Sequence, residues 1–254
     1  MVESILYCAA GLVGAIYLLG PLVAHTVYRF ASRFRFDAVS LDSLPDEISE
    51  EFGHRISEFA SLGFEPLGCF DCGSLVSETQ SYVAYFCNHA TNEFANLSAM
   101  ATQDGPASYL EISSRFSNGR SIDTNTNGIL PVMPGNPDVQ VFRFPAVENP
   151  RTLLEMHRQL VEKYAPGLCP TGEPRDAEIQ RYVRTIENYG PRLATVGYLR
   201  LHGDAYRLTW KGAFRTAWLA LWPVALLRRT IYRHAMQAEL RSLAAHTQAA
   251  LQKA

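Results

Sequence analysis

Four cysteine and histidine residues have the chemistry of metal ligands. Cys69 and Cys72 form a C-x-x-C sequence, and Cys87 and His89 follow within the next seventeen residues. Thiolate sulfur and imidazole nitrogen are the usual ligands of tetrahedral zinc in proteins. A zinc ribbon repeats the C-x-x-C pair, whereas the second pair here is C-x-H inside an expected strand. We therefore expect small buried cysteines, keep a structural zinc site as an alternative, and predict no cofactor.

Three residues are candidate catalytic groups: His157, His89 and Asp123. His157 comes four residues after Leu153 and three before Leu160, on the apolar side of an expected helix. A histidine in that position is expected to be a hydrogen-bonded core residue. A catalytic role would require His157 to meet His89 or Asp123 across a pocket.

Asp123 also opens the sequence D-T-N-T-N-G, which matches the first half of a calcium-binding loop. The twelfth position of such a loop supplies a bidentate glutamate, but that position is Pro134. We therefore expect turn chemistry over residues 123–128 in place of calcium binding. The chain contains no nucleophile elbow, phosphate-binding glycine loop or H-E-x-x-H sequence, so motifs assign no reaction.

Composition excludes several classes of protein. The chain has 254 residues, 47% of them hydrophobic, which is not the composition of a disordered or low-complexity protein. Five cysteines exclude a disulfide-dense mini-protein. Charge is uneven, because residues 37–199 hold 11 Lys and Arg against 22 Asp and Glu, whereas residues 200–254 hold nine against two. Basic ends around an acidic middle favour ends that meet an anionic surface.

Residues 5–24 form a run of twenty residues without a charge. At about 1.5 Å per residue, a helix of this length spans the roughly 30 Å of a bilayer core. Glu3 precedes the run and three arginines follow it, which is not the pattern of a cleaved signal peptide. We therefore predict a single transmembrane helix in the cell membrane, with the N-terminus outside and the main domain in the cytoplasm.

A second apolar run covers residues 216–227 and is too short to cross a bilayer. Basic residues flank it on both sides, so we expect an interfacial segment, with a buried core helix as the alternative. Pro223 is expected to kink any helix in this run. The residues predicted to contact a membrane are the arginines after the first run and the aromatic and basic residues around the second: Arg29, Arg33, Arg35, Trp210, Lys211, Arg215, Trp218, Trp222, Arg228 and Arg229.

Between these runs the pattern predicts an α+β fold, an antiparallel sheet packed with helices and followed by a helical C-terminus. Helices are expected after Ser43, after Asn149 and from about 174 to 189. The expected strands are short runs bounded by turn residues, at 64–70, 82–88, 93–101, 108–116 and 139–144, with a hairpin around 202–205. The predicted organisation is an anchor at 1–28, a basic segment at 29–41, a domain at 42–208 and an apolar and basic end at 209–254.

The hairpin segment, residues 197–212, resembles the wing of winged-helix DNA-binding domains through its G-Y-L-R-L-H-G-D-A-Y-R-L-T-W-K-G sequence. In that resemblance the helix at 174–189 occupies the recognition position, with Arg181 and Arg184 exposed. The segment adjoins the second apolar run, and we do not expect nucleic acid as a partner.

A longer resemblance rests on the Phe116–Arg120 turn, Thr124 and Asn125, His157, and the stretch from Trp210 to Pro223. Together they are similar to uncharacterised bacterial membrane-anchored proteins of unknown function. This resemblance implies an architecture and no chemistry.

The leading hypothesis from the sequence is a membrane-anchored, non-enzymatic binding or scaffold protein that faces the cytoplasm. Its expected partners are the lipid bilayer with its anionic headgroups, and a protein partner or a second copy of the chain. One alternative is an enzyme, or a protein that binds a small ligand or lipid in a pocket between sheet and helices. A zinc-binding or degenerate winged-helix protein is the other.

Overall fold

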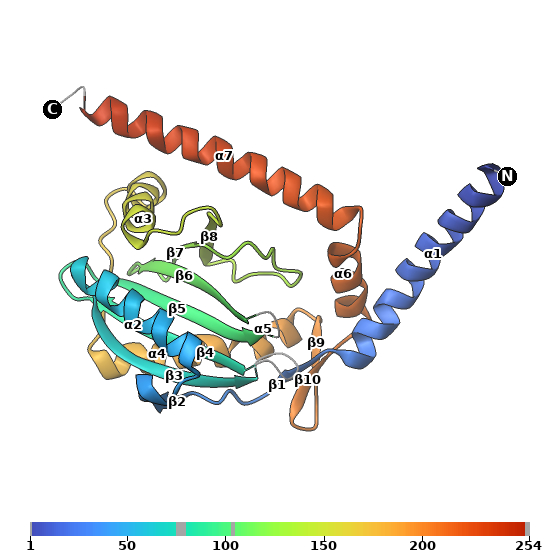
Figure 1. Ribbon diagram of the computed structural model, residues 1–254, viewed down its shortest axis with the longest axis horizontal. Coiled ribbons are helices and arrows are strands. Elements are labelled where there is room, and N and C mark those ends of the chain that lie inside the picture. The colour runs from blue at the N-terminus through green and yellow to red at the C-terminus, as the bar shows by residue number, and fades with distance from the viewer. Residues whose placement is uncertain (1, 75–79, 103–104, 252–254) are drawn as a thin grey trace. The chain divides into compact units, whose positions relative to one another are not determined.

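The computed structural model describes residues 2–74, 80–102 and 105–251 (Figure 1). The chain divides into two compact units. The sheet unit comprises residues 35–130, 135–184 and 233–254, and the α1/α6 unit comprises residues 1–34, 131–134 and 185–232. The α+β class predicted from the sequence is confirmed.

A seven-stranded sheet forms the centre of the sheet unit, in the order β2-β3-β4-β5-β6-β7-β8. All neighbouring strands pair antiparallel except β7 and β8, which are parallel. The strands span Asp37–Val39, Glu65–Ser74, Gln80–Asn88, Glu93–Thr102, Gly105–Arg115, Ser121–Asn125 and Val139–Arg143. The five expected strands are present, and β2 and β7 were not predicted.

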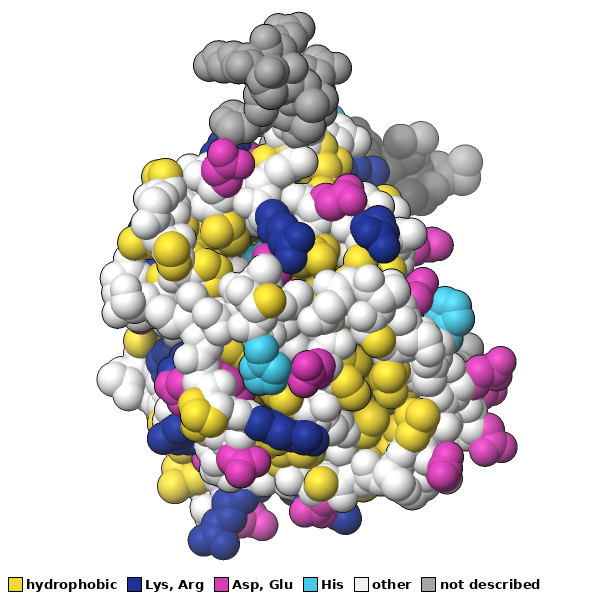
Figure 2. Space-filling model, turned by 90° about the vertical axis from the view of Figure 1, so that its left-hand side faces the viewer, with side chains coloured by type: hydrophobic (Ala, Val, Ile, Leu, Met, Phe, Trp, Pro, Cys, Tyr) yellow, Lys and Arg dark blue, Asp and Glu magenta, His cyan; other side chains and the backbone are white. Residues whose placement is uncertain are grey.

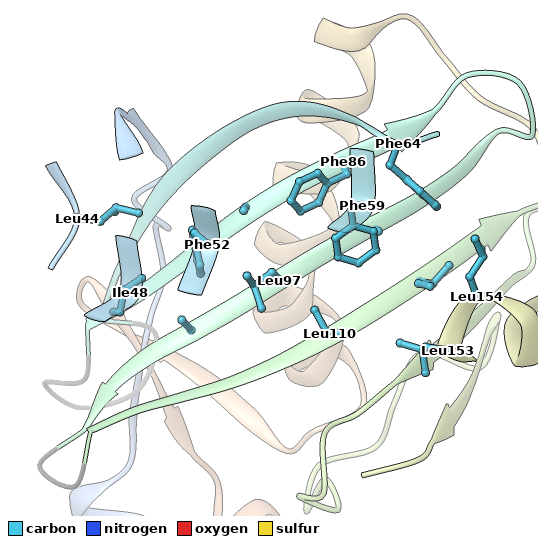
Figure 3. Packing of buried hydrophobic residues seen from close by; sticks show 14 residues of the cluster. Leu44, Ile48, Phe52, Phe59, Phe64, Phe86, Leu97, Leu110, Leu153 and Leu154 are labelled. Atoms are coloured by element: carbon cyan, nitrogen blue, oxygen red, sulfur yellow. The ribbon is translucent and has the colours of Figure 1, made fainter. Parts of the chain in front are cut away.

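One face of the sheet is covered by α2 (Asp46–Ser61), which follows the short 3-10 helix η1 (Leu41–Ser43). Ile48, Phe52 and Phe59 recur on one side of α2 and pack on side chains of the strands, such as Phe86 (Figure 3). Phe52, Phe59 and Phe86 are fully buried. Ser43 does not cap α2, because its hydroxyl donates to the Ser40 carbonyl and α2 begins only at Asp46.

The same face is extended by α3 (Pro150–Tyr164), whose first turn is capped by Asn149 as predicted. Leu153 and Leu154 complete the core beneath α2 (Figure 3). Farther along α3, Leu160 packs with Leu243 of α7 (Val224–Leu251) in a second cluster. An ion pair between Lys163 and Glu239, 2.7 Å apart, also joins the two helices.

The opposite face is covered in part by α4 (Arg175–Glu187), which supplies Ile179 and Tyr182. These side chains pack against Leu67, Phe70, Cys72, Val83, Tyr85, Cys87 and Phe94 of β3, β4 and β5. The apolar character of this face decreases toward β6 and β7, where Glu111, Ser113, Asp123 and Asn125 lie on it, and β8 adds Arg143 beside Val139 and Val141.

The α1/α6 unit contains a small sheet of order β1-β10-β9 and three helices besides the start of α7. The strands are β1 (Arg29–Ala31), β9 (Leu199–His202) and β10 (Ala205–Leu208), and the helices are α1 (Val2–Val27), α5 (Tyr189–Thr195) and α6 (Trp210–Ala220). The expected hairpin is confirmed as β9 and β10, with Gly203 at a positive φ of 64° in the turn. The core includes Ala24, Leu193, Leu208 and Ala213.

Among the residues that the structure describes, none of the helices combines the length and the apolar character needed to cross a bilayer. The predicted transmembrane helix at 5–24 is therefore wrong, and so are the single-pass topology and the cell-membrane localisation derived from it. The run was judged by its lack of charge, but its described part includes Pro21 and packs against α6. A Cβ built at Gly20 would lie 3.2 Å from Leu221 Cδ1 and 3.4 Å from Ala217 Cβ.

Candidate functional site

The polar part of the sheet is organised in rows, because residues paired across adjacent strands lie side by side on one face. One row runs from β4 to β8 through the partners Tyr85, Asn96, Glu111, Asn125 and Arg143. The next row contains Ser113 on β6 and Asp123 on β7, and the preceding row contains Ser98 on β5 and Tyr109 on β6. We use the name polar layer for all of these residues except Tyr85: Asn96, Ser98, Tyr109, Glu111, Ser113, Asp123, Asn125 and Arg143.

Glu111 lies at the centre of the polar layer. Its Oε1 accepts a hydrogen bond from Asn96 Nδ2 at 3.0 Å, and its Oε2 accepts one from Asn125 Nδ2 at 2.9 Å. Both amides are oriented by their oxygens, because Asn96 Oδ1 accepts from the Ser98 hydroxyl and Asn125 Oδ1 accepts from the Asn127 N–H. The two amide donors, one on each oxygen, fix the position of the Glu111 carboxyl group.

Asp123 lies diagonally across from Glu111, since it pairs with Ser113 two positions along β6. The pKa of Asp123 is raised to about 7, mainly by burial and next by the negative charge of Glu111. A hydrogen bond from Ser113 and the charges of Arg115 and Arg143 act in the opposite direction. The two carboxyl groups therefore differ: Glu111 has two amide donors, and Asp123 can hold or release a proton near neutral pH.

Tyrosines border the two carboxyl groups. Burial raises the pKa of Tyr109 to about 12, and its hydroxyl is hydrogen-bonded to Ser98. Burial also raises the pKa of Tyr182 on α4 well above its usual value, and the charge of Glu111 adds to this effect. Both phenols are therefore neutral at physiological pH. Hydroxyls, amides, carboxylates and the Arg143 guanidinium give the polar layer both donors and acceptors.

Arg115 fastens α4 to the sheet beside the polar layer. Its guanidinium forms an ion pair with the fully buried Glu178, donates to the Tyr85 hydroxyl at 2.9 Å and stacks over the Phe94 ring. The second oxygen of Glu178 accepts the Glu173 N–H at 2.9 Å. Burial raises the pKa of Glu178 although Arg115 opposes this. The charge of Arg115 therefore offsets the cost of burying the Glu178 carboxylate.

The predicted catalytic candidates do not come together. His157 is fully buried on the other face of the sheet, bonded to the Ser114 and Thr124 hydroxyls at 2.9 Å each. Burial lowers its pKa to about 4, as expected for a neutral core histidine. Asp123 points to the opposite side of β7 from Thr124. His89 follows β4 and lies 3.8 Å from Glu65.

The cysteine candidates are separated by the strand that carries them. Cys69 packs toward the α2 side and Cys72 toward the α4 side, because residues three apart in a strand point to opposite faces. Burial raises the pKa of Cys72 to about 12 and that of Cys87 to about 11, so these thiols are protonated. Cys87 Sγ lies 3.6 Å from His89 Nδ1. Across the described residues, no three His, Cys, Asp or Glu side chains are grouped as metal ligands.

The basic residues predicted to contact a membrane bind the protein's own backbone in several cases. Lys211 donates to the Val196 carbonyl at 2.7 Å, and Arg228 donates to the Pro131 carbonyl at 2.8 Å. Arg215 donates to the Val132 carbonyl, and Arg29 lies opposite Arg207 in the small sheet. Arg35 belongs to the sheet unit and forms an ion pair with Asp37, whereas Arg33 and Arg229 are exposed.

The predicted aromatic contacts lie on or just after α6. Trp210 stacks on His25 at 4.4 Å, and Trp218 meets Tyr17 edge-on at 5.4 Å. The Trp222 carbonyl accepts the Tyr17 hydroxyl at 2.6 Å. The second apolar run is interrupted where a kink was expected, since α6 ends at Ala220 and α7 begins after Pro223.

Glu111 was not among the predicted site residues. Glu111, Ser113 and Arg115 alternate with apolar residues along β6, a pattern typical of a strand with one solvent-exposed side. In the structure the corresponding side is a half-buried polar layer, in which Asn96 and Asn125 are almost fully buried. The available signal was the recurrence of polar residues at alternate positions on three successive strands.

Comparisons with known proteins found no matching family model, no similar curated protein and no similar solved structure.

Replacing Arg115 with Met will leave Glu178 buried without its cation, and we expect the free energy of unfolding to fall by about 3 to 5 kcal/mol. Adding Glu178→Gln should recover part of this loss, because no buried charge then remains. Urea denaturation of both variants measures the difference. Equal stability of the single and double variants would show that the Glu178 charge does not fasten α4.

His157→Gln will change how stability depends on pH. The folded-state pKa of His157 is about 4 against an ordinary 6.5, so the stability that neutral His157 provides is present above pH 6.5 and is lost as pH falls toward 4. Between pH 7 and pH 5 the wild type should lose about 2 kcal/mol that the variant retains. Urea denaturation at both pH values measures this. A His157 ring that NMR finds protonated at pH 5.5 would contradict the account without any variant.

Asp123→Asn will change the pH dependence of stability in the opposite direction. The folded-state pKa of about 7 lies above the ordinary 3.8, so stability is greatest below pH 3.8 and falls as pH rises through 7. Between pH 4 and pH 7 the variant should gain about 3 kcal/mol over the wild type. Asp138→Asn, at an exposed loop position, is the matched control and should show no such gain. A parallel pH profile for Asp123→Asn and the wild type would refute the raised pKa.

Proposed function

We propose that the sheet unit binds a small organic amine on the polar layer, with Glu111 and Asp123 as the groups that accept its ammonium. The proposal keeps the binding role expected from the sequence and drops the membrane anchor. It moves the site from His157 to the polar layer.

The observation that carries this proposal is that neither carboxyl group has an ion-pair partner among the described residues. Within the described chain, Glu111 and Asp123 are absent from every ion pair. Other carboxylates of the unit are paired, for example Glu93 with Arg158 and Glu178 with Arg115. On the face shown in Figure 2, too, acidic and basic side chains lie interspersed. Half-buried carboxyl groups side by side, with no ion-pair partner among the described residues, favour a cationic ligand.

The orientation of the amides argues for an organic ammonium and against a metal ion. Asn96 and Asn125 direct their NH₂ groups toward Glu111, and their oxygens are used elsewhere. A hard cation needs several oxygen ligands, and the amide oxygens of Asn96 and Asn125 are not directed toward the carboxyl groups to supply them. An ammonium group needs only acceptors, and it can displace the proton that Asp123 holds near neutral pH.

Acid–base chemistry is the second candidate function. A carboxyl group with a pKa of about 7, beside a second carboxyl group that two amides hold in place, is suited to proton transfer. In that case the bound molecule would be a substrate, and Asp123 would accept and return its proton. A bell-shaped pH dependence of turnover with one limb near pH 7 would distinguish this function from binding alone.

The test is a titration of the full chain with ethanolamine, with acetate as the matched anionic probe. The side-chain NH₂ resonances of Asn96 and Asn125 should shift with ethanolamine and not with acetate. Glu111→Gln should weaken the response at least tenfold, because a charge-assisted hydrogen bond contributes about 1.5 to 3 kcal/mol.

Asp123→Asn is the second variant, and the Asp138→Asn control should respond like the wild type. The proposal fails if ethanolamine leaves both NH₂ signals unmoved, or if acetate moves them equally.

A further inference from the structure

The α1/α6 unit contains a hollow of about 300 Å³ that is separate from the polar layer. It is lined by Tyr17 and Pro21 of α1 and by Phe214, Arg215 and Trp218 of α6. The volume lies at the lower end of the range of small-molecule sites.

Aromatic and aliphatic rings make up most of the wall. Phe214 and Trp218 are 55% and 57% exposed although both are large apolar side chains, so part of each ring faces the hollow or solvent without cover. Tyr17 is held in place, because its ring meets Trp218 and its hydroxyl donates to the Trp222 carbonyl. Rigid, uncovered rings of this kind are typical of sites that take an apolar group.

Arg215 is the charged member of the wall. Its Nε–H donates to the Val132 carbonyl at 3.1 Å, and its guanidinium lies over the Tyr198 ring at 5.4 Å. Neither terminal nitrogen of Arg215 has a hydrogen-bond or ion-pair partner among the described residues. A planar guanidinium with two free donors matches a carboxylate.

The charge of the surrounding unit favours an anion as well. The α1/α6 unit contains nine Lys and Arg against three Asp and Glu, and none of the described residues that line the hollow is acidic. A cationic ligand would meet Arg215 without a compensating carboxylate.

We infer that this hollow binds a monocarboxylate with an apolar body, whose carboxylate pairs with Arg215 and whose body lies among Tyr17, Pro21, Phe214 and Trp218. A medium-length acyl chain and an aryl acid share this chemistry. The site is independent of the amine site on the polar layer, because it belongs to the other unit.

The test is isothermal titration calorimetry of the full chain with four probes: decanoate, 2-naphthoate, decanol and decyltrimethylammonium. We expect one decanoate or one 2-naphthoate per chain, and the tighter of the two identifies the acyl or the aryl source. Decanol and decyltrimethylammonium should bind at least tenfold more weakly, because neither offers a carboxylate. Trp218 fluorescence should change with the bound acid.

Arg215→Gln should weaken binding of the acid at least tenfold, whereas Arg229→Gln should leave it unchanged. Arg229 is exposed in the same unit and is not part of the hollow, so it controls for the loss of one positive charge. Decanol that binds as tightly as decanoate, or equal effects of the two variants, would overturn the inference. The comparison of probes on the wild type decides it even if Arg215→Gln does not fold.

Discussion

The polar face of the sheet depends on one arrangement, the Glu111 carboxylate held between the amides of Asn96 and Asn125. Both amides come from the residues directly opposite Glu111 on the adjacent strands. A slip of β6 by one residue would turn Glu111 toward the apolar core and break both hydrogen bonds. The arrangement therefore fixes the register of three strands and places the Glu111 carboxyl group beside Asp123. The raised pKa of Asp123 follows from burial and from that neighbour.

The two faces of the sheet have different roles. On one face, α2 and α3 bury the large apolar side chains that stabilise the sheet, and His157 belongs to that face as a neutral, doubly hydrogen-bonded residue. On the other face, α4 covers the apolar strands and is fastened by the Arg115–Glu178 pair. Because the first face supplies the apolar core, the second can keep the carboxyl groups of Glu111 and Asp123, which form no ion pair among the described residues.

The sequence predicted the apolar elements well and the polar ones poorly. The spacing of Ile48, Phe52 and Phe59 predicted α2, because burial of one helix face repeats every three or four residues. The strand at 121–125 was missed, since Asp and Asn favour turns and its pairing with β6 is a long-range property. Glu111 and Asp123 are twelve residues apart, and only the register of β6 and β7 places them together. At residues 5–24, the absence of charge suggested a membrane span, whereas the described part of α1 packs on α6.

The most direct test of the account is a carboxyl carbon NMR titration of Asp123 in the full chain, compared with Glu111→Gln. The account predicts an apparent pKa near 7 in the wild type. In Glu111→Gln the pKa should fall but stay above the ordinary value, because burial is the larger cause and the charge of Glu111 the smaller. An Asp123 that titrates near its ordinary pKa of 3.8, or one whose titration does not respond to Glu111→Gln, would contradict the central claim that the two carboxyl groups form one coupled site.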